Sequence, residues 1–195
     1  MKKIAIFASG SGSNFQALVD AVREGKLKAD IGLLVCDQPS AAVLQRAQKA
    51  KIDSFCCSPK DFDDKKAFET EIVLQLKSRD IEFIVLAGYM RLIGSTILQE
   101  YPESIVNIHP SLLPAFPGKD AIGQAIDAGV QVSGLTIHYV DAGMDTGPII
   151  FQKEMKIHTH DSRDDVQRRI QQAEHIHYPE ILQQLFSKEA VNVIP

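Results

Sequence analysis

The alternation of short apolar runs with longer amphipathic segments constrains the fold of this chain more than any other feature. The apolar runs are rich in leucine and β-branched residues, as strands covered on both faces of a sheet are. They lie at Ile4–Ala8, Ile31–Cys36, Phe83–Ala87, Ile105–Ile108, Leu135–Val140 and Ile149–Phe151. The amphipathic segments predict helices at Asn14–Glu24, Ala41–Lys51, Lys65–Arg79 and Ala121–Ala128, and a longer one from Arg163 to about Phe186 that Pro179 interrupts. This order predicts an α/β fold with a mainly parallel sheet, whose ligands bind at the carboxyl ends of the strands.

Length and charge limit the classes of protein to which the chain can belong. Its 195 residues predict a single domain, 1–195, that is large enough to be stable without disulfides or metals. The net charge of −4 offers no electrostatic footprint for nucleic acid or for an anionic membrane. Three cysteines, Cys36, Cys56 and Cys57, form neither a disulfide framework nor a metal-ligand pattern, and we expect all three to be reduced and buried. The first apolar run breaks at Ser9 and Gly10, too early for a signal peptide, so we expect a cytoplasmic protein.

The segment Asn107-Ile108-His109-Pro110 ends one of the predicted strands with two chemically useful side chains. Residues two apart on a strand point to the same face, so the carboxamide of Asn107 and the imidazole of His109 lie side by side. A hydrogen-bond donor beside a group that carries a proton near neutral pH suits a reaction that passes through an oxyanion. A plain turn at the His-Pro step is the alternative interpretation of these residues alone.

A glycine-rich loop, Gly10-Ser11-Gly12-Ser13-Asn14, joins the first strand to the first helix. Its free amides and the helix dipole predict an anion site, for which phosphate is the natural occupant, with Ser13 and Asn14 as further donors. A dinucleotide fingerprint with Asp37 as ribose ligand is disfavoured because Phe15 occupies the third glycine position. A glycine turn that binds nothing remains open at this point.

The loop Asp141 to Pro148 is rich in turn residues and carries two carboxylates. If Asp145 folds over the end of the strand that carries His109, it favours the protonated imidazolium and keeps a proton available. Thr136 and His138, two apart on the preceding strand, could converge on His109 as well. For His138, a role as a satisfied core histidine is an equally good interpretation.

Four motifs in register resemble the phosphoribosylglycinamide formyltransferase family and span nearly the whole chain. They are Gly10-Ser11-Gly12-Ser13-Asn14-Phe15, Leu86-Ala87-Gly88-Tyr89-Met90-Arg91, the run from Asn107 to Gly118, and Asp145-Thr146-Gly147-Pro148. The resemblance implies a Rossmann-like formyltransferase fold with a twisted sheet. It also implies transfer of a formyl group from 10-formyltetrahydrofolate to the amine of 5-phosphoribosylglycinamide, in purine biosynthesis and without a metal.

The same resemblance implies roles for individual residues. Asn107, His109 and Asp145 match the catalytic residues, and Gly12, Ser13, Asn14 and Glu174 match those that hold the phosphorylated substrate. Met90, Arg91, Leu92 and Ile93 match the segment that receives the pterin ring of the folate, with Asn107, Asp141 and Met144 completing that pocket. Lys65 stands where the family often has arginine, which keeps a positive charge for the folate tail but loses the bidentate fork. A solvated helix residue is an equally good interpretation of Lys65.

Three other activities compete with this prediction. A formyltetrahydrofolate hydrolase should carry an N-terminal regulatory domain and a second histidine where Pro110 stands, and a methionyl-tRNA formyltransferase should carry a basic C-terminal extension. A phosphate-binding module without catalysis leaves Asn107, His109 and Asp145 unexplained. We therefore expect small-molecule substrates only, and a monomer or a homodimer. The pair His158 and His160 lacks the other ligands of a metal site, and His175 and His177 are assigned no definite role.

Overall fold

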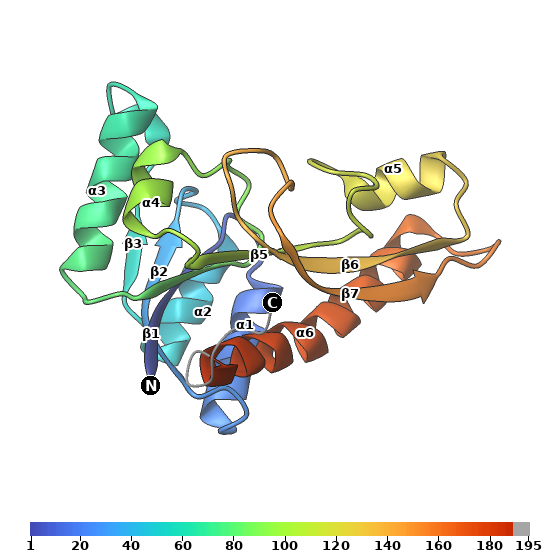
Figure 1. The fold of residues 1–195 in the computed structure, drawn as a ribbon, viewed down its shortest axis with the longest axis horizontal. Coiled ribbons are helices and arrows are strands. Elements are labelled where there is room, and N and C mark those ends of the chain that lie inside the picture. The colour runs from blue at the N-terminus through green and yellow to red at the C-terminus, as the bar shows by residue number, and fades with distance from the viewer. Residues whose placement is uncertain (189–195) are drawn as a thin grey trace.

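The computed structural model describes residues 1–188, which form one sheet of seven strands in the order β3-β2-β1-β4-β5-β6-β7 (Figure 1). The last residues of the predicted domain, 189–195, lie outside the described part of the chain. The strands are β1 (Lys2–Phe7), β2 (Ala29–Cys36), β3 (Ser54–Cys56), β4 (Phe83–Leu86), β5 (Ile105–His109), β6 (Val132–Tyr139) and β7 (Ile149–Lys156). Strands β3, β2, β1, β4 and β5 pair with their neighbours in parallel. Strand β6 pairs with β5, and β7 with β6, in antiparallel orientation. The predicted α/β fold with a mainly parallel sheet is confirmed.

Helices cover both faces of this sheet. They are α1 (Ser13–Arg23), α2 (Ala42–Ala50), α3 (Lys65–Lys77), α4 (Ser95–Glu100), α5 (Ala121–Asp127) and α6 (Arg163–Lys188), with a short 3₁₀ helix η1 at Pro59–Asp61. Figure 1 shows α3 and α4 on one side and α1, α2 and α6 on the other. Residues of β1 alternate between the two cores, because Ile4 and Ile6 pack toward α1 and α6 while Ala5 and Phe7 pack toward α3.

Helix α6 is continuous, so the prediction that Pro179 interrupts it is wrong. The apolar residues Val166 and Ile170 before the proline and Leu182 after it are all buried in the same core. This burial on both sides compensates for the backbone hydrogen bond that proline removes. Between them, the buried phenol of Tyr178 donates to the carbonyl oxygens of Leu86 at 2.8 Å and Val106 at 3.1 Å, which fixes α6 over β4 and β5. No helix within residues 1–188 is both long and apolar enough to cross a membrane.

Short elements and those with exposed residues were the hardest to predict. Strand β3 has three residues and α4 has six, so neither shows a clear period. Strand β7 continues past Phe151 to Lys156. The prediction missed this part because its residues are mostly exposed and polar or charged and form no apolar run. The expectation that all cysteines are buried is wrong for Cys56, which is exposed on the edge strand β3, while Cys36 and Cys57 are buried and all three are free.

The strand order places a crevice at the carboxyl ends of β1 and β4. Strand β1 lies between β2 and β4 in the sheet. The chain goes from β1 to β2 on one side and from β4 to β5 on the other, so the connections that follow β1 and β4 lead in opposite directions. Such a switch point is where open α/β sheets bind ligands. The glycine-rich loop 10–14 and the segment 88–93 occupy its two sides, and β5 delivers Asn107 and His109 beside them.

Candidate active site

A cavity of about 580 Å³ opens at this crevice and brings together nearly all the predicted site residues. Its volume lies within the usual range of small-molecule sites. The predicted residues that line it are Gly12, Ser13, Asn14, Met90, Arg91, Leu92, Ile93, Asn107, His109, Asp141, Met144, Asp145 and Glu174. Among the predicted residues, Lys65 is the exception, because it does not line this cavity.

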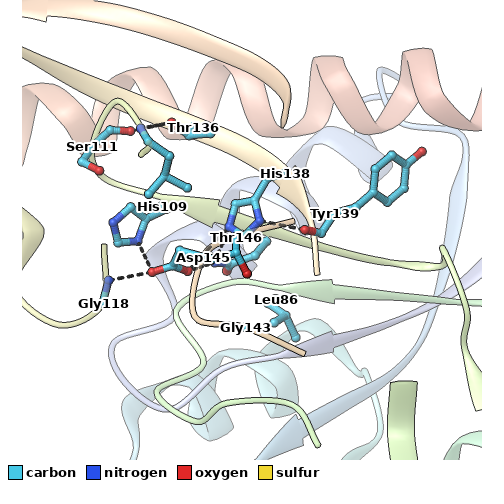
Figure 2. Close-up of polar contacts among 12 residues, drawn as sticks. Leu86, His109, Ser111, Gly118, Thr136, His138, Tyr139, Gly143, Asp145 and Thr146 are labelled. Carbon is cyan, nitrogen blue, oxygen red and sulfur yellow. Dashed lines mark hydrogen bonds and ion pairs between the residues drawn. The ribbon is translucent and has the colours of Figure 1, made fainter. Parts of the chain in front are cut away.

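Asp145 reaches both polar side chains at the end of β5. Its Oδ2 lies 3.4 Å from Nδ1 of His109, and its Oδ1 lies 3.5 Å from Nδ2 of Asn107. The amide of Gly118 donates to Oδ2 at 2.7 Å and holds the carboxylate in place (Figure 2). Asp145 adopts a left-handed backbone conformation with φ 57°, which aspartate tolerates better than most residues. The contact with His109 that the sequence could only suggest is therefore present.

His138 is a member of this cluster. It pairs with Asn107 across the antiparallel β5–β6 ladder, and its Nε2 lies 3.2 Å from Nδ2 of Asn107 and 3.6 Å from Oδ1 of Asp145. Its Nδ1 lies 2.8 Å from the carbonyl oxygen of Tyr139, which only accepts, so Nδ1 carries a proton (Figure 2). Nε2 accepts from Asn107 in the neutral ring and pairs with Asp145 in the protonated ring. The spacing of Thr136 and His138 on one strand was the only sequence signal for this residue.

The electrostatics of the cluster keep Asp145 ionised. The hydrogen bond with His138, the Gly118 amide and the charge of His109 lower the pKa of Asp145 to about 2, although burial acts in the opposite direction. His109 itself is 5% exposed, and its Nε2 lies 2.9 Å from the carbonyl oxygen of Phe116. Both ring nitrogens of His109 therefore face hydrogen-bond acceptors, as an imidazolium requires.

The loop that follows β5 places the carbonyl oxygen of Phe116 against Nε2 of His109. The hydroxyl of Thr136 donates to the carbonyl oxygen of Ser111 at 2.6 Å and accepts from the Leu113 amide at 3.0 Å (Figure 2). The hydroxyl of Ser111 in turn donates to the carbonyl oxygen of Ala115 at 2.6 Å. Thr136 is the cross-strand partner of His109 in the β5–β6 ladder, and it also supports the site through the backbone of residues 111–116.

The loop between β6 and β7 is shaped by Asp141. Its Oδ1 accepts from the amide of Gly143 at 3.0 Å and from the hydroxyl of Thr146 at 2.7 Å. Gly147 is required because a Cβ there would lie 1.9 Å from the carbonyl oxygen of Tyr139. The loop consequently folds back tightly on β6 and presents Met144, 56% exposed, at the mouth of the cavity.

The glycine-rich loop, which leads from β1 into α1, forms the other side of the cavity together with α6. Gly12 has φ 73°, and a Cβ there would lie 2.5 Å from Cγ2 of Val43, so only glycine fits. Asn14 donates from Nδ2 to Oε2 of Glu174 at 2.9 Å, and its own Oδ1 is buried with no partner within the described residues. Burial raises the pKa of Glu174 to about 7, against the hydrogen bond from Asn14, which lowers it.

The segment 88–93 is fixed from behind by groups that follow β1 and β2. The amide of Met90 donates to the hydroxyl of Ser9 at 2.9 Å, and Nε of Arg91 donates to Oδ2 of the buried Asp37 at 2.7 Å. Leu92 and Met90 are exposed toward the cavity mouth, whereas Ile93 belongs to the core beneath α3 and α4. Asp37 has Arg91 as its partner, an arrangement that sequence spacing does not reveal.

Lys65 and the remaining histidines lie away from the cluster. Nζ of Lys65 is 3.8 Å from Oε1 of Glu69, a buried carboxylate that accepts from the Gly94 amide. Residues 158 and 160 are exposed in the connection after β7, and within residues 1–188 no group of three or more His, Cys, Asp and Glu could hold a metal. His177 pairs with Glu180 at 3.1 Å, and burial, then the charge of Arg46, lowers the pKa of His175.

Comparisons with known proteins agree with this geometry. A family model described as formyl transferase matches residues 2–182. Phosphoribosylglycinamide formyltransferase from Bacillus subtilis (strain 168) is 55% identical over 185 residues, which are 95% of this chain and 95% of that protein. The crystal structure of phosphoribosylglycinamide formyltransferase from Bacillus halodurans matches with a TM-score of 0.94 and 50% identity, covering 96% of this chain and 97% of that one. Glycinamide ribonucleotide transformylase 1 from Geobacillus kaustophilus matches with a TM-score of 0.93 and 57% identity, over 95% and 98%. The chain therefore belongs to the formyl transferase family, among the phosphoribosylglycinamide formyltransferases.

Proposed function

We propose that the protein transfers the formyl group of 10-formyltetrahydrofolate to the amine of 5-phosphoribosylglycinamide, a step of purine biosynthesis. The observation that carries this proposal is the position of the Asp145 carboxylate between His109 at 3.4 Å and Asn107 at 3.5 Å. A donor, a proton carrier and a fixed negative charge at the end of one strand suit attack of an amine on a formyl carbon. Family membership and the relatives named above support the same activity.

The proposed reaction needs no nucleophile from the protein, because the substrate amine is one. Its nitrogen forms a bond to the formyl carbon, and the formyl oxygen becomes an oxyanion. Asn107 donates from Nδ2 to this oxygen, and His109 donates a second hydrogen bond. The bond from carbon to N10 of the folate then breaks, N10 takes a proton from His109, and the amine loses its proton to water ordered near Asp145.

The two ring nitrogens of His109 differ in how readily each can give its proton to the folate. Nε2 is committed to the carbonyl oxygen of Phe116 at 2.9 Å. Nδ1 is 3.4 Å from Asp145, longer than the roughly 2.7–2.9 Å of a tight charge-assisted hydrogen bond. We therefore assign the transferred proton to Nδ1, with Asp145 as its counter-ion.

For the phosphorylated substrate, we propose the side of the cavity formed by α1 and α6. The amides of Gly12, Ser13 and Asn14 lie at the N-terminus of α1, where the helix dipole favours a phosphate. Glu174 lines the same side, and with a pKa of about 7 it can accept or donate a hydrogen bond near neutral pH. The unpartnered Oδ1 of Asn14 is a further acceptor for this substrate.

For the folate, we propose the other side of the cavity. Met90, Arg91, Leu92 and Ile93 form one wall, and Asn107 together with the loop residues Asp141 and Met144 forms the opposite wall. Lys65 lies outside these walls, so its predicted role toward the folate tail requires its side chain to leave Glu69. We also propose that the protein binds small molecules only and that it is a monomer or a homodimer. We propose the cytoplasm as its compartment.

The test is a spectrophotometric assay of tetrahydrofolate formation with and without phosphoribosylglycinamide. We expect product only when the amine substrate is present. Tetrahydrofolate that forms without it would identify a hydrolase instead. No product under either condition, from a protein whose circular dichroism shows that it is folded, would refute the proposed transfer.

A further inference from the structure

The proposed reaction leaves one buried carboxylate at the edge of the site unexplained. Asp37 follows β2 directly and is 3% exposed. Its Oδ2 accepts from Nε of Arg91 at 2.7 Å and from Nε2 of Gln38 at 3.3 Å, while Oδ1 is buried without a partner within the described residues. A buried ion pair contributes little net stability compared with apolar residues of the same size. Core packing is therefore a poor reason for a carboxylate at this position.

Arg91 connects this carboxylate to the cavity. Its side chain is 41% exposed, and the residue lines the cavity wall. The guanidinium also lies over the ring of Phe68, with its carbon 5.9 Å from the ring centroid. A carboxylate behind and an aromatic face beside it restrict a long side chain that would otherwise sample many rotamers.

The rest of segment 88–93 is held from the same inner side. The Ser9 amide donates to the carbonyl oxygen of Gly88 at 3.0 Å, and its hydroxyl accepts from the amide of Met90. The ring of Tyr89 packs edge-on against Phe7, with centroids 5.3 Å apart. These contacts fix residues 88–90 to β1, whereas beyond them Asp37 is the ion-pair partner that ties residue 91 to β2.

We propose that Asp37 is a positioning residue for folate recognition, which acts through Arg91 to hold the wall of segment 88–93 in its binding geometry. The inference rests on the proposed function for the identity of the ligand. It separates the two substrates, because Asp37 follows β2 and pairs with Arg91 on the folate side of the cavity, whereas the loop proposed for phosphate follows β1. A substitution at Asp37 should therefore affect folate affinity selectively.

The test is Asp37→Asn, which keeps the size of the side chain and removes its charge. We expect the KM for 10-formyltetrahydrofolate to rise about tenfold or more, since asparagine offers Arg91 a neutral oxygen and the negative charge that strengthens this hydrogen bond is lost. The KM for phosphoribosylglycinamide and kcat at saturation should change by less than about twofold. Isothermal titration with tetrahydrofolate should show the same loss of affinity without turnover. Asp30→Asn, an exposed position on the same strand, is the matched control and should change neither quantity.

A double-mutant cycle with Arg91→Gln tests whether Asp37 acts through Arg91. Once Arg91 is replaced, Asp37→Asn should weaken tetrahydrofolate binding no further. If the two effects add, or if Asp37→Asn lowers kcat and weakens both substrates together, the inference is overturned. If Asp37→Asn does not fold, Arg91→Lys serves in its place, because Arg91 is more exposed than Asp37 and a substitution there disturbs the core less. This variant keeps the positive charge and should also weaken tetrahydrofolate binding. Unchanged binding in Arg91→Lys would overturn the inference as well, whereas a wild-type protein that binds tetrahydrofolate but transfers no formyl group would refute only the proposed function.

Discussion

Glu174→Gln should make the protein more stable in alkaline solution. The carboxyl of Glu174 is 5% exposed, and its pKa is about 7 against an ordinary value of 4.5. Each pKa unit corresponds to about 1.36 kcal/mol, so ionised Glu174 lowers the free energy of unfolding by about 3 kcal/mol. Glutamine keeps an oxygen that accepts from Asn14 and carries no charge to bury.

The sign and the pH window of this effect follow from the two pKa values. Below pH 4.5 the carboxyl is protonated in both the folded and the unfolded chain, so burial imposes no penalty. Between pH 4.5 and about 7 the unfolded chain releases its proton first, and the stability of the wild type falls. Above about 7 both states are ionised and the full penalty is present.

Urea unfolding followed by circular dichroism at pH 4 and pH 8 measures this difference. We expect Glu174→Gln to exceed the wild type by up to about 3 kcal/mol at pH 8 and by less than about 0.5 kcal/mol at pH 4. Glu154→Gln, at an exposed position of β7, should show no such pH dependence. A Glu174→Gln effect of the same size at both pH values would refute the reasoning, because it could not arise from the ionisation of Glu174.

Three further substitutions test the proposed roles. Asn107→Ala removes an oxyanion donor and should lower kcat by about 10²-fold or more, as single-turnover kinetics would measure; unchanged turnover would exclude that role. Asp145→Asn removes the counter-ion 3.4 Å from His109, so kcat should fall by about 10-fold or more in a steady-state assay; a kcat that stays at the wild-type value would contradict its function. Gly12→Ala places a Cβ 2.5 Å from Val43 at φ 73°, and urea unfolding should show a loss of about 2 kcal/mol or more, with a raised KM for phosphoribosylglycinamide.

The cluster at the end of β5 illustrates how far sequence reasoning reaches. Asn107 and His109 were predicted to share a face because side chains alternate along any strand, whatever surrounds it. Asp145 could only be proposed as their partner, since its position depends on a loop that folds back on β6. His138 joins them through the antiparallel register of β5 and β6, and that register is a long-range property which no local pattern specifies.

Local chemistry within the chain was sufficient for the alternation of strands and helices, the glycine-rich loop at residues 10–14 and the shared face of Asn107 and His109. Those features depend on residues that are close in sequence, where apolar period and glycine geometry dominate. The tertiary structure alone decided that α6 runs through Pro179 and that Lys65 lies beside Glu69. It also decided that Asp37 holds Arg91, because burial and ion pairing between distant segments depend on how the sheet and helices pack.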